Sequence, residues 1–170
     1  RAALISLQRQ EAGRAIETLE KSCRANPEST QAWLDLASIY QMSGRTNDAV
    51  RIYTKVLKLD SSNSFSYVAL ARLRFQQRQD QQAMDMLERG ARRGRNVSAL
   101  VAFCYTQGRE FVGTSEISRA IPLFQFIARY SPTQRLQFYS LLGELYEGLG
   151  YDDEAVKSYT QATMETPPLP

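Results

Sequence analysis

Two cysteines, Cys23 and Cys104, are the residues of this chain best suited to nucleophilic or metal chemistry. A thiol becomes a nucleophile when a neighbouring base takes its proton, and histidine is the usual base. The sequence contains no histidine, so it also lacks the commonest ligand for transition metals. The two cysteines fit no metal or redox spacing. Cys104 lies in an apolar segment, where we expect a small core side chain.

The remaining candidate for chemistry is an acidic run, Asp152, Asp153 and Glu154. It stands where a helix is expected to begin, and the helix dipole stabilises carboxylates there without any metal ion. No glycine is followed by lysine, so the sequence lacks a phosphate-binding loop. We therefore expect no cofactor, and we expect that the chain is not an enzyme.

Arginines make the middle of the chain basic, and three acidic residues partly offset them. The arginines are Arg72, Arg74, Arg78, Arg89, Arg92, Arg93 and Arg95, and the acidic residues are Asp80, Asp85 and Glu88. The net charge of the whole chain is only +3, and the repeats described below lack the positions that read RNA bases in helical-repeat proteins. We expect no nucleic-acid partner. The basic region is a solvated face or a patch that attracts an acidic protein.

The chain contains no apolar run of the ~20 residues that a membrane-spanning helix needs, so no membrane insertion is expected. It begins with Arg1 instead of methionine, and we expect it to be part of a longer protein. Its compartment is therefore left open. Two unpaired-looking cysteines favour a reducing cytosol, while a bacterial periplasmic location stays open if the parent protein carries a signal peptide.

A small residue followed four positions later by a large apolar residue recurs along the chain. The pairs are Ala15 and Leu19, Ala49 and Tyr53, Ala83 and Leu87, Ala120 and Phe124, and Ala155 and Tyr159. Successive alanines are 34, 34, 37 and 35 residues apart. Residues four apart lie on the same face of a helix, so the alanine lets a second helix approach and the large side chain fills the space beside the contact. The pattern predicts stacked helix pairs.

Two stretches add a further pattern before the alanine. They read Trp33-x2-Leu36-Ala37-x2-Tyr40 and Tyr139-x2-Leu142-Gly143-x2-Tyr146, and Pro167 follows the second. This resembles the tetratricopeptide repeat (TPR), W-x2-L-G-x2-Y…A-x3-F…P, which is a helix–turn–helix unit. The resemblance implies an all-α, right-handed superhelical α-solenoid of stacked antiparallel helix pairs. It would hold about four and a half repeats and about nine helices.

We expect one TPR-like domain over residues 1–170. Its parts are a partial repeat at 1–29, holding a truncated first helix and a full second helix, and repeats at 30–63, 64–97, 98–135 and 136–170. Pro27, Pro132 and Pro167 are expected to follow helix ends, because proline cannot continue a helix. Arg74 stands where the family has tyrosine, and we expect its stem to lie along the neighbouring helix with its head in water.

The third complete repeat is longer than the others and has Val101 at the Trp position. We place its extra residues in a long turn from Gly108 to Ser118. Phe111 and Val112 are too apolar for a freely solvated loop, so we expect them to pack on a neighbouring helix, with contact to a partner as the alternative. The segment Gly113–Ser115 is expected to be mobile, because glycine adds backbone freedom.

In TPR proteins the first helix of each pair lines the concave surface, so the resemblance also implies a groove. Transferring the inward positions of the family to this chain gives Leu34, Asp35, Ser38, Phe65, Val68, Arg72, Phe75, Phe103 and Glu144. Aromatic rings there suit an apolar side chain of a protein or peptide partner, and the alternative is that the rings pack between repeats. Neither lysine nor asparagine occurs among these positions, which disfavours the TPR subclass that grips a terminal carboxylate.

The predicted function is a non-catalytic scaffold that binds a peptide or protein segment in the concave groove. The alternative is a structural spacer or a self-association module within a larger protein. Such a module would form a homo-oligomer through exposed repeat ends, and a truncated helix at residues 1–10 with an uncovered apolar face would favour it.

Overall fold

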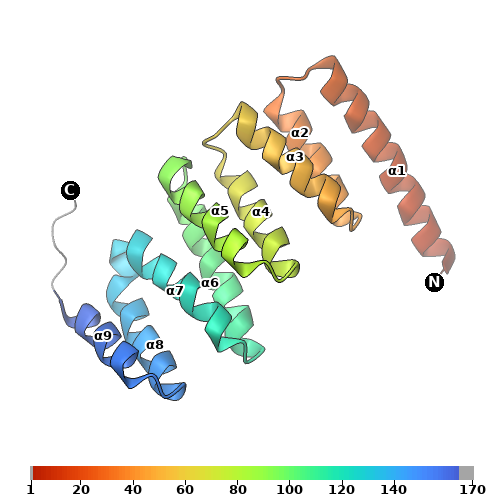
Figure 1. Ribbon diagram of the computed structural model, residues 1–170. Helices are drawn as coiled ribbons and strands as arrows, with labels where there is room; N and C mark the ends of the chain where they lie inside the picture. The colour runs from red at the N-terminus through yellow and green to blue at the C-terminus, as the bar shows by residue number, and fades with distance from the viewer. Residues whose placement is uncertain (1, 165–170) are drawn as a thin grey trace. The chain divides into compact units, whose positions relative to one another are not determined.

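The computed structural model describes the backbone of residues 2–164 and the side chains of residues 11–164. Within them the chain forms nine α-helices, one short 3-10 segment and no strand (Figure 1). The helices are α1 (Ala2–Ala25), α2 (Thr30–Met42), α3 (Thr46–Leu59), α4 (Ser64–Gln76), α5 (Asp80–Arg93), α6 (Val97–Gly113), α7 (Ile117–Tyr130), α8 (Arg135–Gly148) and α9 (Asp152–Thr163), and the 3-10 segment is η1 (Pro132–Gln134). The all-α prediction is confirmed.

Four antiparallel helix pairs follow α1: α2 with α3, α4 with α5, α6 with α7, and α8 with α9 (Figure 1). The chain divides into two compact units, with the boundary between Arg95 and Asn96. The first unit holds α1 to α5 and the second holds α6 to α9. The expected single domain over residues 1–170 stays a prediction.

Helix α1 differs from the expectation for residues 1–29. It is one continuous helix of 24 residues, so the expected truncated first helix followed by a separate second helix is wrong. Gly13 lies inside it, and a methyl group added there would meet no other atom within 4 Å. The helix ends at Ala25, two residues before Pro27, as expected. Pro167 lies outside the described residues.

The turns between the paired helices are equally short in all four pairs. Each has three residues, and the middle residue adopts a left-handed backbone conformation: Gly44 (φ 72°), Arg78 (φ 59°), Ser115 (φ 61°) and Gly150 (φ 73°). Each of these residues precedes the alanine of the repeat by five positions. The expected long turn from Gly108 to Ser118 is therefore wrong. Instead, α6 has 17 residues where α2 and α4 have 13.

Gly108 explains where the extra residues lie. A methyl group on Gly108 would lie 2.5 Å from the ring of Phe124, so the glycine marks a close contact between α6 and α7 and not a turn. Gly143 has the same relation to Tyr159 in the last pair. Counted from this contact, Cys104 and not Val101 holds the Trp position. The extra residues therefore lengthen the start of α6 by about one helical turn.

The same count places Phe111 at the position that tyrosine occupies in the motif. Its side chain is buried, and the guanidinium carbon of Arg119 lies 4.0 Å from the centre of its ring. The expected packing of Phe111 on a neighbouring helix is confirmed. The same expectation for Val112 is wrong, because Val112 is exposed. The mobility of Gly113–Ser115 stays a prediction.

Two glycines of α6 provide a test of this register. Gly108→Ala should lower the free energy of unfolding by about 1 kcal/mol or more, because crowding the buried Phe124 ring costs more than the ~1 kcal/mol that alanine gains over glycine in a helix. Gly113→Ala meets open space and should leave stability unchanged or raise it. Thermal melts of both variants measure the difference. Equal melting temperatures would contradict the assigned contact.

Candidate protein-binding surface

In the first unit, α2 and α4 are each the first helix of a pair, and their predicted inward residues other than Phe75 lie on a partly open face. Asp35, Phe65 and Arg72 are exposed, while Leu34, Ser38 and Val68 are half-buried. The Phe65 ring is 57% exposed, which is unusual for so large an apolar side chain inside a helix pair. We call this set, together with Gln41 of α2, the α2–α4 surface.

Tyr53 of α3 connects the two sides of the α2–α4 surface. Its hydroxyl donates to Gln41 Oε1 at 3.1 Å and lies 3.4 Å from Ser38 Oγ, both on α2. Its ring meets the Phe65 ring of α4 edge-on, with 6.1 Å between the ring centres. Burial raises the pKa of the Tyr53 phenol, so it remains a hydrogen-bond donor near neutral pH. Tyr53 therefore holds Phe65 and the polar groups of α2 in one place.

The surface carries opposite charges on its two helices. Asp35 lies on α2, where its Oδ1 accepts a hydrogen bond of 2.8 Å from Gln31 Nε2. Arg72 lies on α4 and is exposed. An extended segment that lies across both helices would thus meet an anionic group, an exposed ring and a cationic group. Such a surface can bind and orient a peptide, and its residues form no set that could hold a metal ion.

Two predicted ring anchors are not available to a partner. Phe75 is 4% exposed and Phe103 is 7% exposed, so for these two rings the burial favours the alternative that the sequence left open, packing inside the fold. Helix α4 packs against both α3 and α5, which buries its apolar residues on several sides. Phe103 was placed inward because the register of α6 was counted from Val101 instead of Cys104.

In the second unit, the corrected register moves Tyr105 and Arg109 to the inward positions of α6. Tyr105 is exposed, meets the Phe138 ring edge-on at 6.2 Å and lies 5.8 Å from the Arg109 guanidinium carbon. It also lines a cavity of about 420 Å³ with Tyr130 and Gln134. These residues would have been found by counting backwards from Ala120. The predicted Glu144 is exposed on α8.

Sequence reasoning also missed the role of Tyr53. It was placed among the large residues that fill the space between paired helices, and the packing role is real, since the side chain is 1% exposed. Its hydroxyl at the tip of the ring nevertheless reaches the inward residues of α2. The only sequence signal was that tyrosine, and not leucine or phenylalanine, occupies this position.

In the described part of the chain, no group of three histidine, cysteine or carboxylate side chains is close enough to share a metal ion. No helix there combines the length and the apolar character that crossing a membrane requires. Both cysteines are buried.

Comparison with known proteins bears on the fold. A family model described as tetratricopeptide repeat matches residues 1–168. The chain is similar to a crystal structure of MamA, with 26% sequence identity and a TM-score of 0.58. The match covers 91% of this chain and 88% of that chain. MamA 41-end from Desulfovibrio magneticus RS-1 is 18% identical (TM-score 0.55, 95% and 89% covered). YrrB, a TPR protein with an unusual peptide-binding site, is 17% identical (TM-score 0.54, 95% and 80% covered). No curated protein sequence matches the chain.

Proposed function

The chain belongs to the tetratricopeptide-repeat family, and from this premise we propose that it is a non-catalytic scaffold that binds a peptide or protein segment on the α2–α4 surface. The TPR fold, a solenoid of helical repeats, generally mediates protein–protein interaction. The solved structure of YrrB, which shares the fold, has an unusual peptide-binding site.

The observation that carries the proposal is the exposed Phe65 side chain, whose ring packs edge-on against the buried Tyr53 ring. Aromatic side chains that are held in one orientation on a surface are typical anchors of protein interfaces. Phe65 lies between the acidic Asp35 and the basic Arg72. We infer a partner segment with an apolar side chain on Phe65, a cationic group towards Asp35 and a carboxylate towards Arg72.

The experiment starts from a partner captured by the wild-type chain and titrates it by calorimetry. Phe65→Ala combined with Arg72→Ala should weaken the affinity at least about tenfold, which corresponds to about 1.4 kcal/mol. The melting temperature should change little, because both side chains are exposed. This result would separate binding from folding.

The matched control is Leu136→Ala combined with Lys157→Ala in the second unit. It also removes one exposed apolar side chain and one positive charge, and it should leave the affinity unchanged. Equal affinities for the wild type and the Phe65→Ala/Arg72→Ala variant would place the binding site elsewhere.

A second candidate function, self-association, is favoured by the end of the second unit. Tyr159 of α9 is 36% exposed, whereas the equivalent residues of the earlier repeats, Tyr53, Leu87 and Phe124, are at most 2% exposed. Val156 of the same helix is 64% exposed. The side chains of residues 1–10, where an exposed apolar face was also expected, lie outside the described residues. Sedimentation velocity over a range of concentrations tests this function. Val156→Glu should abolish any dimer seen with the wild type.

A further inference from the structure

Among the residues that the structure describes, one kind of hydrogen bond joins the first helix of a pair to the helix before it at two equivalent places. The Tyr40 hydroxyl of α2 donates to Glu20 Oε1 of α1 at 2.6 Å. The Tyr146 hydroxyl of α8 accepts from Gln125 Nε2 of α7 at 2.9 Å. Both tyrosines hold the same motif position, and Glu20 and Gln125 each lie five residues after the alanine of their repeat. The bond therefore recurs at equivalent positions of two repeats, where it ties the first helix of a pair to the helix that precedes it.

The equivalent residues between α4 and α3 are Arg74 and Thr54, and they do not form this bond. Arg74 Nη1 donates to Gln77 Oε1 at 3.2 Å and to Gln79 Oε1 at 2.7 Å, in the turn that follows α4. Thr54 Oγ1 donates to the Val50 carbonyl of its own helix at 2.8 Å. The expectation that the head of Arg74 lies in water is thus only partly met. Arg74 stands where the motif has tyrosine, so α3 and α4 lack this link.

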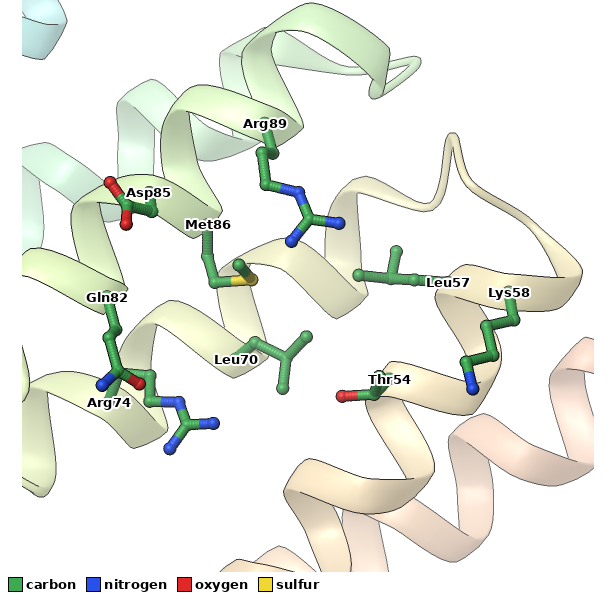
Figure 2. Close-up of a pocket in the computed structure, with 9 residues that line it drawn as sticks. All are labelled: Thr54, Leu57, Lys58, Leu70, Arg74, Gln82, Asp85, Met86 and Arg89. Carbon is green, nitrogen blue, oxygen red and sulfur yellow. The ribbon is translucent and has the colours of Figure 1, made fainter.

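A cavity of about 300 Å³ opens there, and Figure 2 shows its lining. The residues are Thr54, Leu57 and Lys58 of α3, Leu70 and Arg74 of α4, and Gln82, Asp85, Met86 and Arg89 of α5. At the equivalent place one repeat earlier, the buried Tyr40 ring reaches Glu20 and the cavity is about 200 Å³. We call the larger cavity the α3–α5 pocket.

The α3–α5 pocket combines an apolar centre with a basic rim. The side chains of Leu57, Leu70 and Met86 converge on its centre, and the guanidinium groups of Arg74 and Arg89 extend towards the same space from two sides (Figure 2). Lys58 adds a third cation from α3. The acidic member of the lining, Asp85, already accepts a hydrogen bond of 3.2 Å from Gln81 Nε2. Positive charge therefore dominates around an apolar centre.

We propose that the α3–α5 pocket is a second docking site and that it takes an acidic peptide segment with one aliphatic side chain. The aliphatic group would lie between Leu57 and Met86, and neighbouring carboxylates would pair with Arg74 and Arg89, because guanidinium and carboxylate match in charge and geometry. A nucleic acid fits less well, since the lining offers no aromatic ring for base stacking. The site is built mainly from the second helices, α3 and α5, and so is separate from the α2–α4 surface.

The test uses the full chain and a set of fluorescein-labelled acidic peptides that differ in a central leucine, valine or serine. Fluorescence anisotropy should show binding of the leucine and valine peptides, and weaker binding of the serine peptide. Peptides with glutamine in place of glutamate should not bind. A wild-type chain that binds none of the acidic peptides overturns the proposal.

Charge-matched variants on α5 separate the pocket from general attraction. Arg89→Gln should raise the Kd about tenfold, because it removes a cation from the rim. Arg93→Gln changes the net charge equally but lies outside the lining, and it should raise the Kd about twofold at most, since exposed charges are screened by salt. Equal losses in the two variants would overturn the proposal, as would competition by a single-stranded oligonucleotide at the same concentration as unlabelled peptide.

Restoring the motif gives a variant that tests the site without weakening the fold. Thr54→Gln combined with Arg74→Tyr reproduces the pairing of Gln125 with Tyr146 and should close the pocket. We expect peptide binding to be lost while the melting temperature stays the same or rises. Unchanged binding would overturn the proposal. The Phe65→Ala/Arg72→Ala variant should bind the acidic peptides normally, and a loss there would instead assign them to the α2–α4 surface.

Discussion

Replacing Phe75 with alanine is expected to lower the free energy of unfolding by about 3–5 kcal/mol, because the change leaves a cavity under a ring that is almost fully enclosed. The ring is 4% exposed, on a helix that packs against α3 and α5. Urea denaturation followed by circular dichroism measures the loss.

Phe65→Ala is the matched control for this prediction. The same substitution on the same helix removes a ring that is 57% exposed, and it should cost about 1 kcal/mol or less. The comparison decides which phenylalanine of α4 is core and which is free for a partner. A similar, small cost at both positions would mean that Phe75 also faces an open groove, which is one of the two alternatives that the sequence left open.

The helix pairs could be predicted because two local features agree at each of them. The alanines fix where paired helices touch, and the large residue four positions later fixes which face is buried. Ala49, Ala83 and Ala120 are all fully buried, as this pattern requires. The all-α fold therefore follows from spacing, and it does not depend on any long-range contact that a sequence would hide.

The register of α6 could not be predicted in the same way. The 37-residue step shows that residues were added, but a helix can be lengthened at either end, and neither choice breaks its apolar pattern. Gly108 favoured the wrong assignment, in which the added residues form a long turn after it. Glycine suits a turn because it tolerates positive φ, and it equally suits a close helix contact because it lacks a side chain. The contact with Phe124 is the reason for glycine here.

The candidate site shows a similar limit. Family positions single out Asp35, Phe65 and Arg72, and all three residues are exposed. The family positions do not predict that Phe75 is buried, because they define only which face of a single helix a residue lies on. Whether that face is exposed depends on the helices packed beside it. The α3–α5 pocket was hidden for another reason: Arg74 was visible as a departure from the motif, but its effect depends on Thr54, which comes from the preceding repeat.

Ala49→Leu is expected to lower the free energy of unfolding by about 1–3 kcal/mol, because three added carbons must enter a contact that has no spare volume. Ala49 is fully buried in the same cluster as Ala37 and Tyr53. Asn47→Leu is the control, since Asn47 lies two residues earlier on α3 and is exposed. It should change stability by about 0.5 kcal/mol at most. Thermal melts of the two variants provide the measurement, and an unchanged melting temperature for Ala49→Leu would show that α2 and α3 do not touch where the repeat pattern places them.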